Sequence, residues 1–354
     1  MVEAEAGKYH GGMATVGESR RNGTGASAEV VLVGRQLDDN ENLGLGYLAA
    51  ALVGLAPVHR LVLNRADELE RSADAILASG ARLVGLSLPD GGCAHLPLAL
   101  GELLRRRGFA GHVTAGGPFA TLARGWLLER YGWLGSVVRF AGEAPLRELV
   151  VALREGRDLG AVPGLTTRAG DGPPAPVTSA LPLRLRPLRG ERPQLLGHGV
   201  AHLQATRGCV GRCAYCGPAA LQALEVAEGE RAGVEASTLR RLGVGGVRRR
   251  PVADLCAEIA ELYRDGVRYF YFVDEHVLPT EEREALAFLA ALGDGLRRRG
   301  VGRLGFGCML RAELLTERLV DAFADVGLVR AFLGVELATP AEGRRYRRRV
   351  DPGH

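Results

Sequence analysis

Three of the six cysteines lie within eight consecutive positions, in the stretch ATRGCVGRCAYCGPA at residues 205–219. Three residues separate Cys209 from Cys213, two separate Cys213 from Cys216, and the aromatic Tyr215 precedes the last cysteine. We call residues 209–216 the cysteine loop. Thiolates at these spacings can converge on one soft metal centre, and a [4Fe–4S] cluster normally takes four of them. With only three, one iron keeps a free coordination position where chemistry can take place.

Two other interpretations of the cysteines stay open. Zinc favours four ligands in structural sites and could recruit His202, Cys256 or Cys308 as the fourth. Zinc sites usually pair two C-x-x-C knuckles, however, and this chain has one such pair. The third interpretation, buried and inert cysteines, fits poorly with three of them in one loop that also contains Gly and Arg. The pattern therefore favours the cluster.

The composition describes a globular protein with room for two domains. The 354 residues are 47% hydrophobic and 24% charged, and a chain of this length can bury two cores of ordinary size. The longest apolar run, YLAAALVGLAPV, is too short to cross a bilayer, and the N-terminus lacks a signal-peptide pattern. We expect a cytoplasmic protein without membrane contact, in which cysteines stay reduced unless they are catalytic or bind metal.

The net charge of +4 comes almost entirely from arginine, because Lys8 is the only lysine. Runs of three arginines occupy residues 248–250, 297–299 and 347–349. No aromatic residues alternate with them, as stacking on nucleic-acid bases would require. We interpret the runs as solvated surface and expect no nucleic-acid partner.

Strand and helix patterns alternate along the first half of the chain. Helical patterns begin near Asn42, Asp67, Ala94, Phe119 and Glu143, between β-rich runs at 29–34, 59–64, 82–89, 112–117 and 136–142. This alternation predicts an α/β fold that begins with a doubly wound, flavodoxin-like domain at residues 28–158, with its ligand at the carboxyl ends of the strands. Residues 1–27 are predicted to be a flexible tail, and the Pro- and Gly-rich residues 159–197 a linker.

A second series fills residues 198–354 and places the cysteine loop after its first strand. Strands are predicted at 199–206, 267–275, 303–310 and 329–339, and helices at 251–266, 280–300 and 314–327. Thr280 is the expected cap of the middle helix, and the interval before Arg250 is expected to be an insertion. Four such units are too few to close an eightfold barrel, so this half is predicted to be an open or partial (β/α) barrel.

The loop CVGRCAYC, after a strand that ends in ATRG, resembles the cluster loop of the radical S-adenosylmethionine (radical SAM) enzymes. In that family the methionine group of S-adenosylmethionine (SAM) binds the open iron, and reductive cleavage releases a 5′-deoxyadenosyl radical. The resemblance implies that Cys209, Cys213 and Cys216 hold a [4Fe–4S] cluster. It also implies a barrel of six units, so the last strands are expected to be missing here.

The same resemblance implies further SAM-binding residues. Asp274 and Glu275, in YFVDEHV, match the place where the family offers acceptors to the SAM amino group, although an ordinary helix-initiating acidic pair is the alternative. Arg311, in GCMLRAELL, matches a basic residue that pairs with the SAM carboxylate, a task suited to a guanidinium. Glu336, in LGVELAT, resembles an element near the ribose and the substrate, without the small polar residues that often follow it.

In the company of a radical SAM half, the first domain resembles the cobalamin-binding domain that precedes many enzymes of this superfamily. NLGLGYLAAAL, GLSLP, VTAGGPFATL and FAGEAPLRELVVAL are the supporting stretches. Asp39, Glu41 and Gly44 occupy the positions of the usual Asp-x-His-x-x-Gly motif, with Glu41 in place of the cobalt-binding histidine. Small residues beside which the cobalamin tail is expected are Ser87, Gly116 and Gly117.

These features predict a cobalamin-dependent radical SAM enzyme with a [4Fe–4S] cluster, SAM and cobalamin. The resemblance implies a methyltransferase for an unactivated centre of a specialised metabolite or peptide, with an electron donor such as flavodoxin or ferredoxin. Two alternatives stay open: a radical cyclisation or rearrangement without methyl transfer, and a non-catalytic protein that binds the cluster or cobalamin. A zinc-stabilised nucleic-acid binder would need a fourth ligand that the sequence does not reveal.

Overall fold

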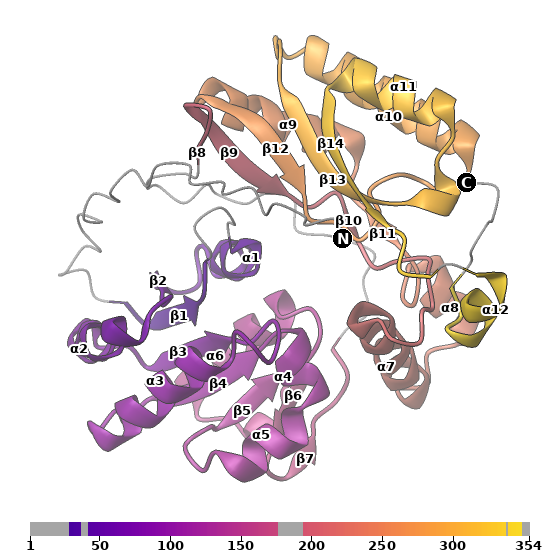
Figure 1. Ribbon diagram of the computed structural model, residues 1–354. Helices are drawn as coiled ribbons and strands as arrows, with labels where there is room; N and C mark the ends of the chain where they lie inside the picture. The colour runs from indigo at the N-terminus through magenta and orange to yellow at the C-terminus, as the bar shows by residue number, and fades with distance from the viewer. Residues whose placement is uncertain (1–27, 37–41, 176–193, 338, 349–354) are drawn as a thin grey trace, which may run out of the picture.

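The computed structural model describes residues 28–36, 42–175, 194–337 and 339–348. They form two units, each built on a mainly parallel sheet, which occupy the lower and upper halves of Figure 1. The first unit comprises residues 28–36 and 42–175, and the second begins at residue 194. The predicted tail at residues 1–27 and most of the predicted linker lie outside the described residues.

The first unit contains a sheet in the order β2-β1-β3-β4-β5-β6-β7. Its parallel strands are β1 (Val30–Gly34), β2 (Val58–Val62), β3 (Leu83–Ser87), β4 (His112–Gly116) and β5 (Ser136–Val138). The order 2-1-3-4-5 is the flavodoxin-like arrangement, whose ligand crevice lies where the strand order reverses, between β1 and β3. The prediction of a doubly wound first domain is confirmed.

Helices cover both faces of the first sheet, because alternate strand residues are apolar on each side. Val30 and Leu32 face one core, whereas Val31 and Val33 face the other. The helices are α1 (Leu43–Ala51) and α6 (Glu143–Glu155) on the first face, and α2 (Leu69–Ser79), α3 (His95–Arg106), α4 (Pro118–Leu122) and α5 (Arg124–Arg130) on the second. All but α5 begin within two residues of the predicted starts.

The first sheet continues into the segment interpreted from sequence as a linker. After a 3-10 helix, η2 (Leu159–Ala161), β6 (Leu165–Thr167) and β7 (Gly170–Asp171) add to β5 as antiparallel strands. They are short and lie among Pro, Gly and Arg residues, so no periodicity marks them. The folded part of the first unit therefore runs past residue 158.

The second unit contains a sheet in the order β14-β13-β12-β9-β8. The strands β9 (His198–Leu203), β12 (Val267–Phe272), β13 (Gly305–Arg311) and β14 (Leu328–Gly334) are parallel, and β8 (Gln194–Leu195) pairs antiparallel with β9. Parallel neighbours follow one another in chain order, as in an opened barrel. The prediction of a partial (β/α) barrel is confirmed.

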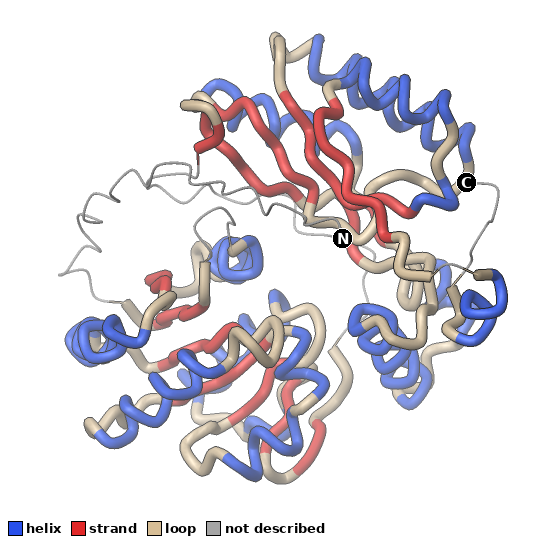
Figure 2. The backbone as a smooth tube through the Cα atoms, in the orientation of Figure 1, coloured by secondary structure: helices blue, strands red, loops and turns tan. Residues whose placement is uncertain are grey.

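Three helices cover one face of the second sheet, as Figure 2 shows: α9 (Val252–Arg264), α10 (Glu282–Arg297) and α11 (Glu317–Val326). Phe272 and Phe306 point into the core on this face, where their rings stack at 5.2 Å. The expected cap of α10 at Thr280 is wrong. The N-cap is Glu281, which makes no side-chain cap bond, and Glu282 and Glu284 in the first turn complement the helix dipole instead.

The predicted insertion after the cysteine loop is folded. It contains α7 (Gly217–Arg231), α8 (Ala236–Arg241) and β11 (Arg248–Arg249), which pairs antiparallel with β10 (Thr206–Arg207), the strand before the loop. The helix α7 packs against α4 of the first unit, and in Figure 1 α7 lies beside that unit. The insertion therefore joins the two halves of the molecule.

The first arginine run lies inside the fold, so its interpretation as solvated surface is wrong. Arg250 forms a buried ion pair with Glu258, at 2.6 Å. The Arg249 guanidinium lies 5.2 Å from the Phe288 ring centre and donates to the carbonyl oxygen of Val277. These arginines hold β11 against the helical side of the second unit.

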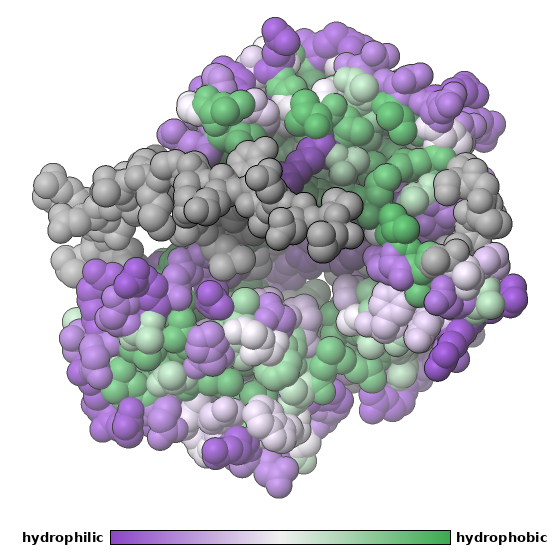
Figure 3. Space-filling model, viewed as in Figure 1, coloured by the Kyte–Doolittle hydropathy of each residue, from purple (hydrophilic) through white to green (hydrophobic). Residues whose placement is uncertain are grey.

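The strand β14 forms an edge of the second sheet, and most of its side chains are exposed. Figure 3 shows apolar residues along its course, in agreement with the exposed Val329, Phe332 and Leu333. Beyond it, α12 (Pro340–Arg345) begins with a capping box between Thr339 and Glu342. None of the helices in the described ranges is both long and apolar enough to span a membrane.

Candidate functional site

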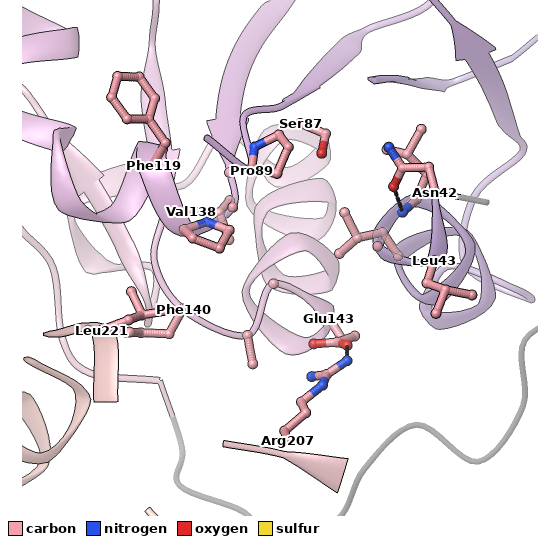
Figure 4. A pocket seen from close by; sticks show the side chains of 18 of the residues that line it. Asn42, Leu43, Ser87, Pro89, Phe119, Val138, Phe140, Glu143, Arg207 and Leu221 are labelled. Atoms are coloured by element: carbon pink, nitrogen blue, oxygen red, sulfur yellow. Dashed lines mark hydrogen bonds and ion pairs between the residues drawn. The ribbon is translucent and has the colours of Figure 1, made fainter. Parts of the chain in front are cut away.

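A cavity of about 900 Å³ lies between the two units, at the carboxyl ends of the first-unit strands. Its first-unit wall is largely apolar and includes Val138 and Phe140, which are drawn in Figure 4. Its second-unit wall comes from the two flanks of the cysteine loop, with Arg207 before the loop and Leu221 after it. The cavity therefore occupies the place where a 2-1-3-4-5 sheet binds its ligand.

Four residues of the predicted cobalamin site line this cavity: Gly44, Ser87, Gly116 and Gly117. Gly117 has a φ of 105°, and a Cβ atom there would lie 2.8 Å from the carbonyl oxygen of Leu88. Only glycine fits this position, which brings the backbone directly to the cavity. The other two predicted residues, Asp39 and Glu41, lie outside the described residues.

The cysteine loop lies between β10 and α7. Cys213 is buried, Cys209 and Cys216 are half-buried, and all three are free thiols. Cys216 is the N-cap of α7, and its N–H donates to the carbonyl oxygen of Cys213 at 3.1 Å. Gly208, with a φ of 95°, turns the chain into the loop at a point where a Cβ atom would clash with Gly246. The backbone of the cysteine loop is thus fixed on one side by the turn at Gly208 and on the other by the start of α7.

The donors of the loop fit a three-thiolate cluster better than a zinc site. Across the described ranges, no group of three or more His, Cys, Asp and Glu side chains is arranged to hold a metal ion, so the fit rests on donor chemistry. The candidate fourth ligands for zinc are engaged in packing. Cys256 donates to the Leu292 carbonyl oxygen at 3.6 Å, Cys308 is fully buried in the helix-covered core, and His202 is buried beside the Tyr271 ring.

Arg311 lies at the end of β13 beside the cysteine loop. Its Nη1 atom is 3.9 Å from the Cys209 sulfur, and its guanidinium forms an ion pair with Glu313. Burial alone would lower the pKa of Arg311, but the Glu313 carboxylate and the neighbouring thiols raise it above its ordinary value. The structure therefore brings a fixed positive charge to the predicted cluster site.

The predicted pair Asp274 and Glu275 divides into two different environments. Asp274 is 1% exposed, and its carboxylate accepts hydrogen bonds from the Ala205 N–H at 3.1 Å and from the N–H and hydroxyl of Thr206. It therefore fixes the strand end that leads into the cysteine loop. Burial raises its pKa, against the effect of these hydrogen bonds.

Glu275 instead lines the cavity. Its own backbone N–H is near enough to its carboxylate to lower the pKa, but by less than burial raises it. Burial, with a smaller contribution from the Asp274 charge, raises the pKa of Glu275. A poorly solvated carboxylate at a cavity wall is a suitable acceptor for a cationic group of a ligand.

Glu336 does not line the cavity. Its carboxylate pairs with Arg348 at 2.7 Å and lies 3.5 Å from the hydroxyl of Tyr215, the aromatic residue of the cysteine loop. The segment after α12 also contacts the loop, because the Ala214 N–H donates to the Tyr346 carbonyl oxygen at 2.9 Å. Glu336 thus connects β14 with the outer side of the cysteine loop, and its predicted role near the ribose stays a prediction.

Sequence reasoning missed three residues of the site. His276 follows Glu275, and its Nδ1 atom accepts the Arg311 N–H at 3.3 Å. Burial, with the charges of Arg311 and Arg249, lowers the pKa of His276 to about 4, so the imidazole is neutral. Glu143 and Arg207, from different units, form an ion pair at 2.5 Å on the cavity wall. Only folding brings these residues together, so no local pattern could have identified the pair.

Comparison with protein families matches residues 203–354 to the Radical SAM superfamily. This segment holds the cysteine loop, Glu275 and Arg311. Comparison with curated proteins gives no sequence match.

Solved structures of two other proteins are similar to most of this chain. One is TsrM from Kitasatospora setae, a radical SAM methyltransferase with cobalamin and a [4Fe–4S] cluster bound, with a TM-score of 0.68 and 19% identity over 89% of this chain and 60% of that one. It has also been solved with tryptophan substrate and the SAM analogue aza-SAM. The other is OxsB, a cobalamin-dependent SAM radical enzyme with aqua-cobalamin and SAM bound, with a TM-score of 0.70 and 19% identity over 92% of this chain and 46% of that one.

This chain thus spans 60% of the length of TsrM and 46% of that of OxsB. At 19% identity, the likeness establishes a shared fold. The family match covers the second unit, and the fold match extends over both units. Residues 203–354 therefore match the radical SAM family model, and most of the chain shares the fold of the cobalamin-dependent radical SAM enzymes TsrM and OxsB.

Proposed function

We propose that this chain is a cobalamin-dependent radical SAM enzyme. The observation that carries the proposal is the place of the cysteine loop, whose two flanks form one wall of the cavity. The opposite wall is the ligand edge of the flavodoxin-like sheet. A cofactor on the cysteines and a second cofactor in the first unit would therefore lie on opposite sides of this cavity.

The second unit supplies the groups for the cluster and SAM. Cys209, Cys213 and Cys216 are the proposed cluster ligands, and the loop offers no fourth thiol that would close the remaining iron position. Glu275 offers a carboxylate to the SAM amino group, and Arg311 offers a guanidinium to the SAM carboxylate. Two charges of opposite sign would thereby orient a zwitterionic amino-acid group.

The first unit supplies the proposed cobalamin site. Gly116 and Gly117 let a ligand reach the backbone at the end of β4, and Ser87 lies at the end of the neighbouring β3. Leu86 and Val138 give the cavity an apolar floor. Bound structures of TsrM and OxsB with cobalamin support this assignment.

When bound, the cluster and SAM supply a one-electron route to a 5′-deoxyadenosyl radical, and cobalamin supplies a methyl group. The residues of this chain bind, orient and shield. The apolar side chains of Phe140 and Leu221 line the cavity from the two units and exclude water. Arg311 and Glu275 fix one end of SAM at the cysteine loop.

Methyl transfer to an unactivated carbon or phosphorus centre of a small molecule or peptide is the proposed reaction. TsrM, a methyltransferase with tryptophan as substrate, supports this outcome. A flavodoxin or ferredoxin in a reducing cytoplasm is the proposed electron donor. Radical rearrangement without methyl transfer is the second candidate, because OxsB is described as a radical enzyme and not as a methyltransferase.

Anaerobic reconstitution with iron and sulfide, followed by incubation with a reductant, hydroxocobalamin and methyl-labelled SAM, tests the proposal. Four irons per chain and release of 5′-deoxyadenosine are expected, and Cys216→Ala should lose both. Cys93→Ser, at a half-buried cysteine of the first unit, is the control and should keep both.

The fate of the label separates the two candidate reactions. Label that leaves SAM as methyl supports methyl transfer. Release of 5′-deoxyadenosine with the methyl group retained on methionine supports rearrangement. A colourless protein with one zinc and no iron would overturn both.

A further inference from the structure

One short connection in the first unit contacts both flanks of the cysteine loop. It comprises residues 139–142, between β5 and α6, together with Glu143, the first residue of α6, and we call these five residues the β5–α6 connection. Arg139 at its start pairs with Glu228 in α7, the helix that follows the loop. Glu143 at its end pairs with Arg207 in β10, the strand that precedes the loop. Two ion pairs between the units thus bracket the three cysteines.

The Arg139 pair is entirely inside the protein. The Arg139 side chain is 0% exposed and that of Glu228 9%. The Arg139 Nη2 atom is 2.7 Å from Glu228 Oε1, and its Nε donates to both oxygens of that carboxylate at 3.1 Å. Charged groups paired in this way in a low-dielectric interior do not exchange partners with water. The orientation of α7, and with it of its N-cap Cys216, is therefore fixed to the first unit.

The Glu143 pair lies on the cavity wall. In Figure 4 the Glu143 carboxylate and the Arg207 guanidinium point toward each other, and their closest atoms are 2.5 Å apart. The Arg207 guanidinium also lies 5.2 Å from the ring centre of Tyr47 in α1, and its Nε donates to Gln204 at 3.0 Å. Arg207 precedes Cys209 by two residues. A movement of Glu143 would consequently displace the Arg207 side chain and, through it, the backbone that leads to Cys209.

Between the two ion pairs, the connection faces the cavity. Phe140, Ala141, Gly142 and Glu143 all line it. Phe140 has a φ of 53°, which is unfavourable for an aromatic residue, and its N–H donates to the Thr121 hydroxyl at 3.0 Å. A ligand that fills the cavity therefore contacts the same five-residue connection that holds both flanks of the cysteine loop.

We propose that the β5–α6 connection couples ligand binding in the cavity to the position of the cysteine loop, with Glu143 and Arg207 as positioning residues. This inference deepens the proposed function and rests on it. Coupling between two binding sites is reciprocal. If the cavity ligand changes the affinity of the cysteine loop for its cluster by some factor, the bound cluster must change the affinity of the cavity for its ligand by the same factor. A purely structural ion pair would change the stability of the protein and leave the two sites independent.

Titration with hydroxocobalamin, of cluster-free and of cluster-loaded protein, measures this coupling without any turnover. For the unsubstituted chain we expect a Kd at least about fivefold lower when the cluster is present, which is the lower end of ordinary coupling between sites. Glu143→Gln, which keeps the shape and removes the charge, should bring the ratio of the two Kd values to within about twofold of one. Arg207→Lys, which keeps the charge, should retain part of the ratio.

Glu148→Gln is the matched control. Glu148 lies on the same helix, pairs with Arg157 at 3.5 Å, and is exposed. It should leave the ratio unchanged. If Glu143 only contacted the ligand, its substitution would raise both Kd values by the same factor and leave their ratio unchanged. This result would overturn the inference.

Two further outcomes distinguish this inference from the proposed function. Equal Kd values for cluster-free and cluster-loaded unsubstituted protein would overturn the coupling while leaving the function intact. Absence of cobalamin binding in either form, or failure to load any cluster, would overturn the proposed function and the coupling together.

Discussion

Asp274, which follows β12, binds Thr206, the first residue of the segment that leads into the cysteine loop. Its carboxylate accepts hydrogen bonds from the N–H and from the hydroxyl of Thr206, and from the N–H of Ala205 at 3.1 Å. These contacts are buried, and Thr206 itself is 0% exposed. Asp274 is thus a support of the loop, whereas its neighbour Glu275 faces the cavity.

Asp274→Asn should destabilise the protein before any cofactor is present. An amide has one acceptor oxygen in place of two, so at least one of the three donors loses its partner in a buried position. We expect a loss of about 1–3 kcal/mol in the free energy of unfolding, measured by thermal or denaturant unfolding, and a lower iron content after reconstitution. Thr206→Val, which removes only the hydroxyl bond, should be milder. An unchanged midpoint in Asp274→Asn would contradict this support role.

Glu275→Gln should have the opposite effect on stability. The folded-state pKa of Glu275 lies above its ordinary value of 4.5, so the folded protein loses stability as the pH rises through that window and the buried carboxyl ionises. The variant carries no such charge. It should therefore be more stable than the unsubstituted chain at pH 7, and the difference should shrink as the pH falls toward 4.5.

Binding separates the two roles of this acidic pair further. Glu275→Gln should weaken SAM binding to the cluster-loaded protein by about tenfold or more, because a hydrogen bond to a charged group is lost. Isothermal titration with SAM at pH 7 measures this. A gain in stability with unchanged SAM affinity would assign Glu275 to another ligand.

Glu228→Gln should be among the most destabilising single changes in α7. Removal of one charge leaves the fully buried Arg139 with only the more distant Asp171 carboxylate, 3.8 Å away, to balance it, so we expect a cost of up to about 3–5 kcal/mol. Glu230→Gln, two residues further along the helix and exposed, should have almost no effect. Denaturant unfolding of the cofactor-free protein compares the two. Equal midpoints would show that the ion pair does not join the units in solution.

The local features of this fold could be predicted from sequence because they depend on residues close together in the chain. The parallel strands appear as β-rich runs, and α1 begins after Asn42, whose side chain accepts the Leu45 N–H at 3.1 Å. The cysteine spacing, the glycines at the ends of the first-unit strands and the position of Arg311 at the end of β13 are also local patterns. Within each of the two sheets, such residues lie close together because parallel strands end at the same edge.

The features that sequence could not reveal depend on distant partners. Arg139 and Glu228 are 89 positions apart, and neither stands in a pattern that distinguishes it from a surface charge. The strands β6 and β7 are too short to show periodicity. Residues in and next to these strands nevertheless accept hydrogen bonds from the Arg139 guanidinium, which donates to the Thr166 hydroxyl at 3.1 Å and to the Gly172 carbonyl oxygen at 2.9 Å. Likewise, Arg250 belongs to a charged run, and its burial depends on distant partners such as the Glu258 carboxylate, at 2.6 Å, and the Gln204 carbonyl oxygen, at 3.1 Å.

Gly116 and Gly117 are adjacent, but alanine should be tolerated only at position 116. At Gly117 the positive φ and the carbonyl oxygen of Leu88, 2.8 Å from the added Cβ, oppose any side chain, so Gly117→Ala should cost more than about 1 kcal/mol of stability. At Gly116 the added Cβ would meet Val138 at 3.6 Å, an ordinary contact, so Gly116→Ala should unfold like the unsubstituted chain.

Both residues line the cavity, and hydroxocobalamin retained after desalting measures the effect of each substitution on cobalamin binding. Gly117→Ala should retain less cobalamin even at temperatures where it is fully folded, because the strained turn shifts the backbone that the ligand approaches. Full retention in folded Gly117→Ala would place the cobalamin tail elsewhere in the cavity.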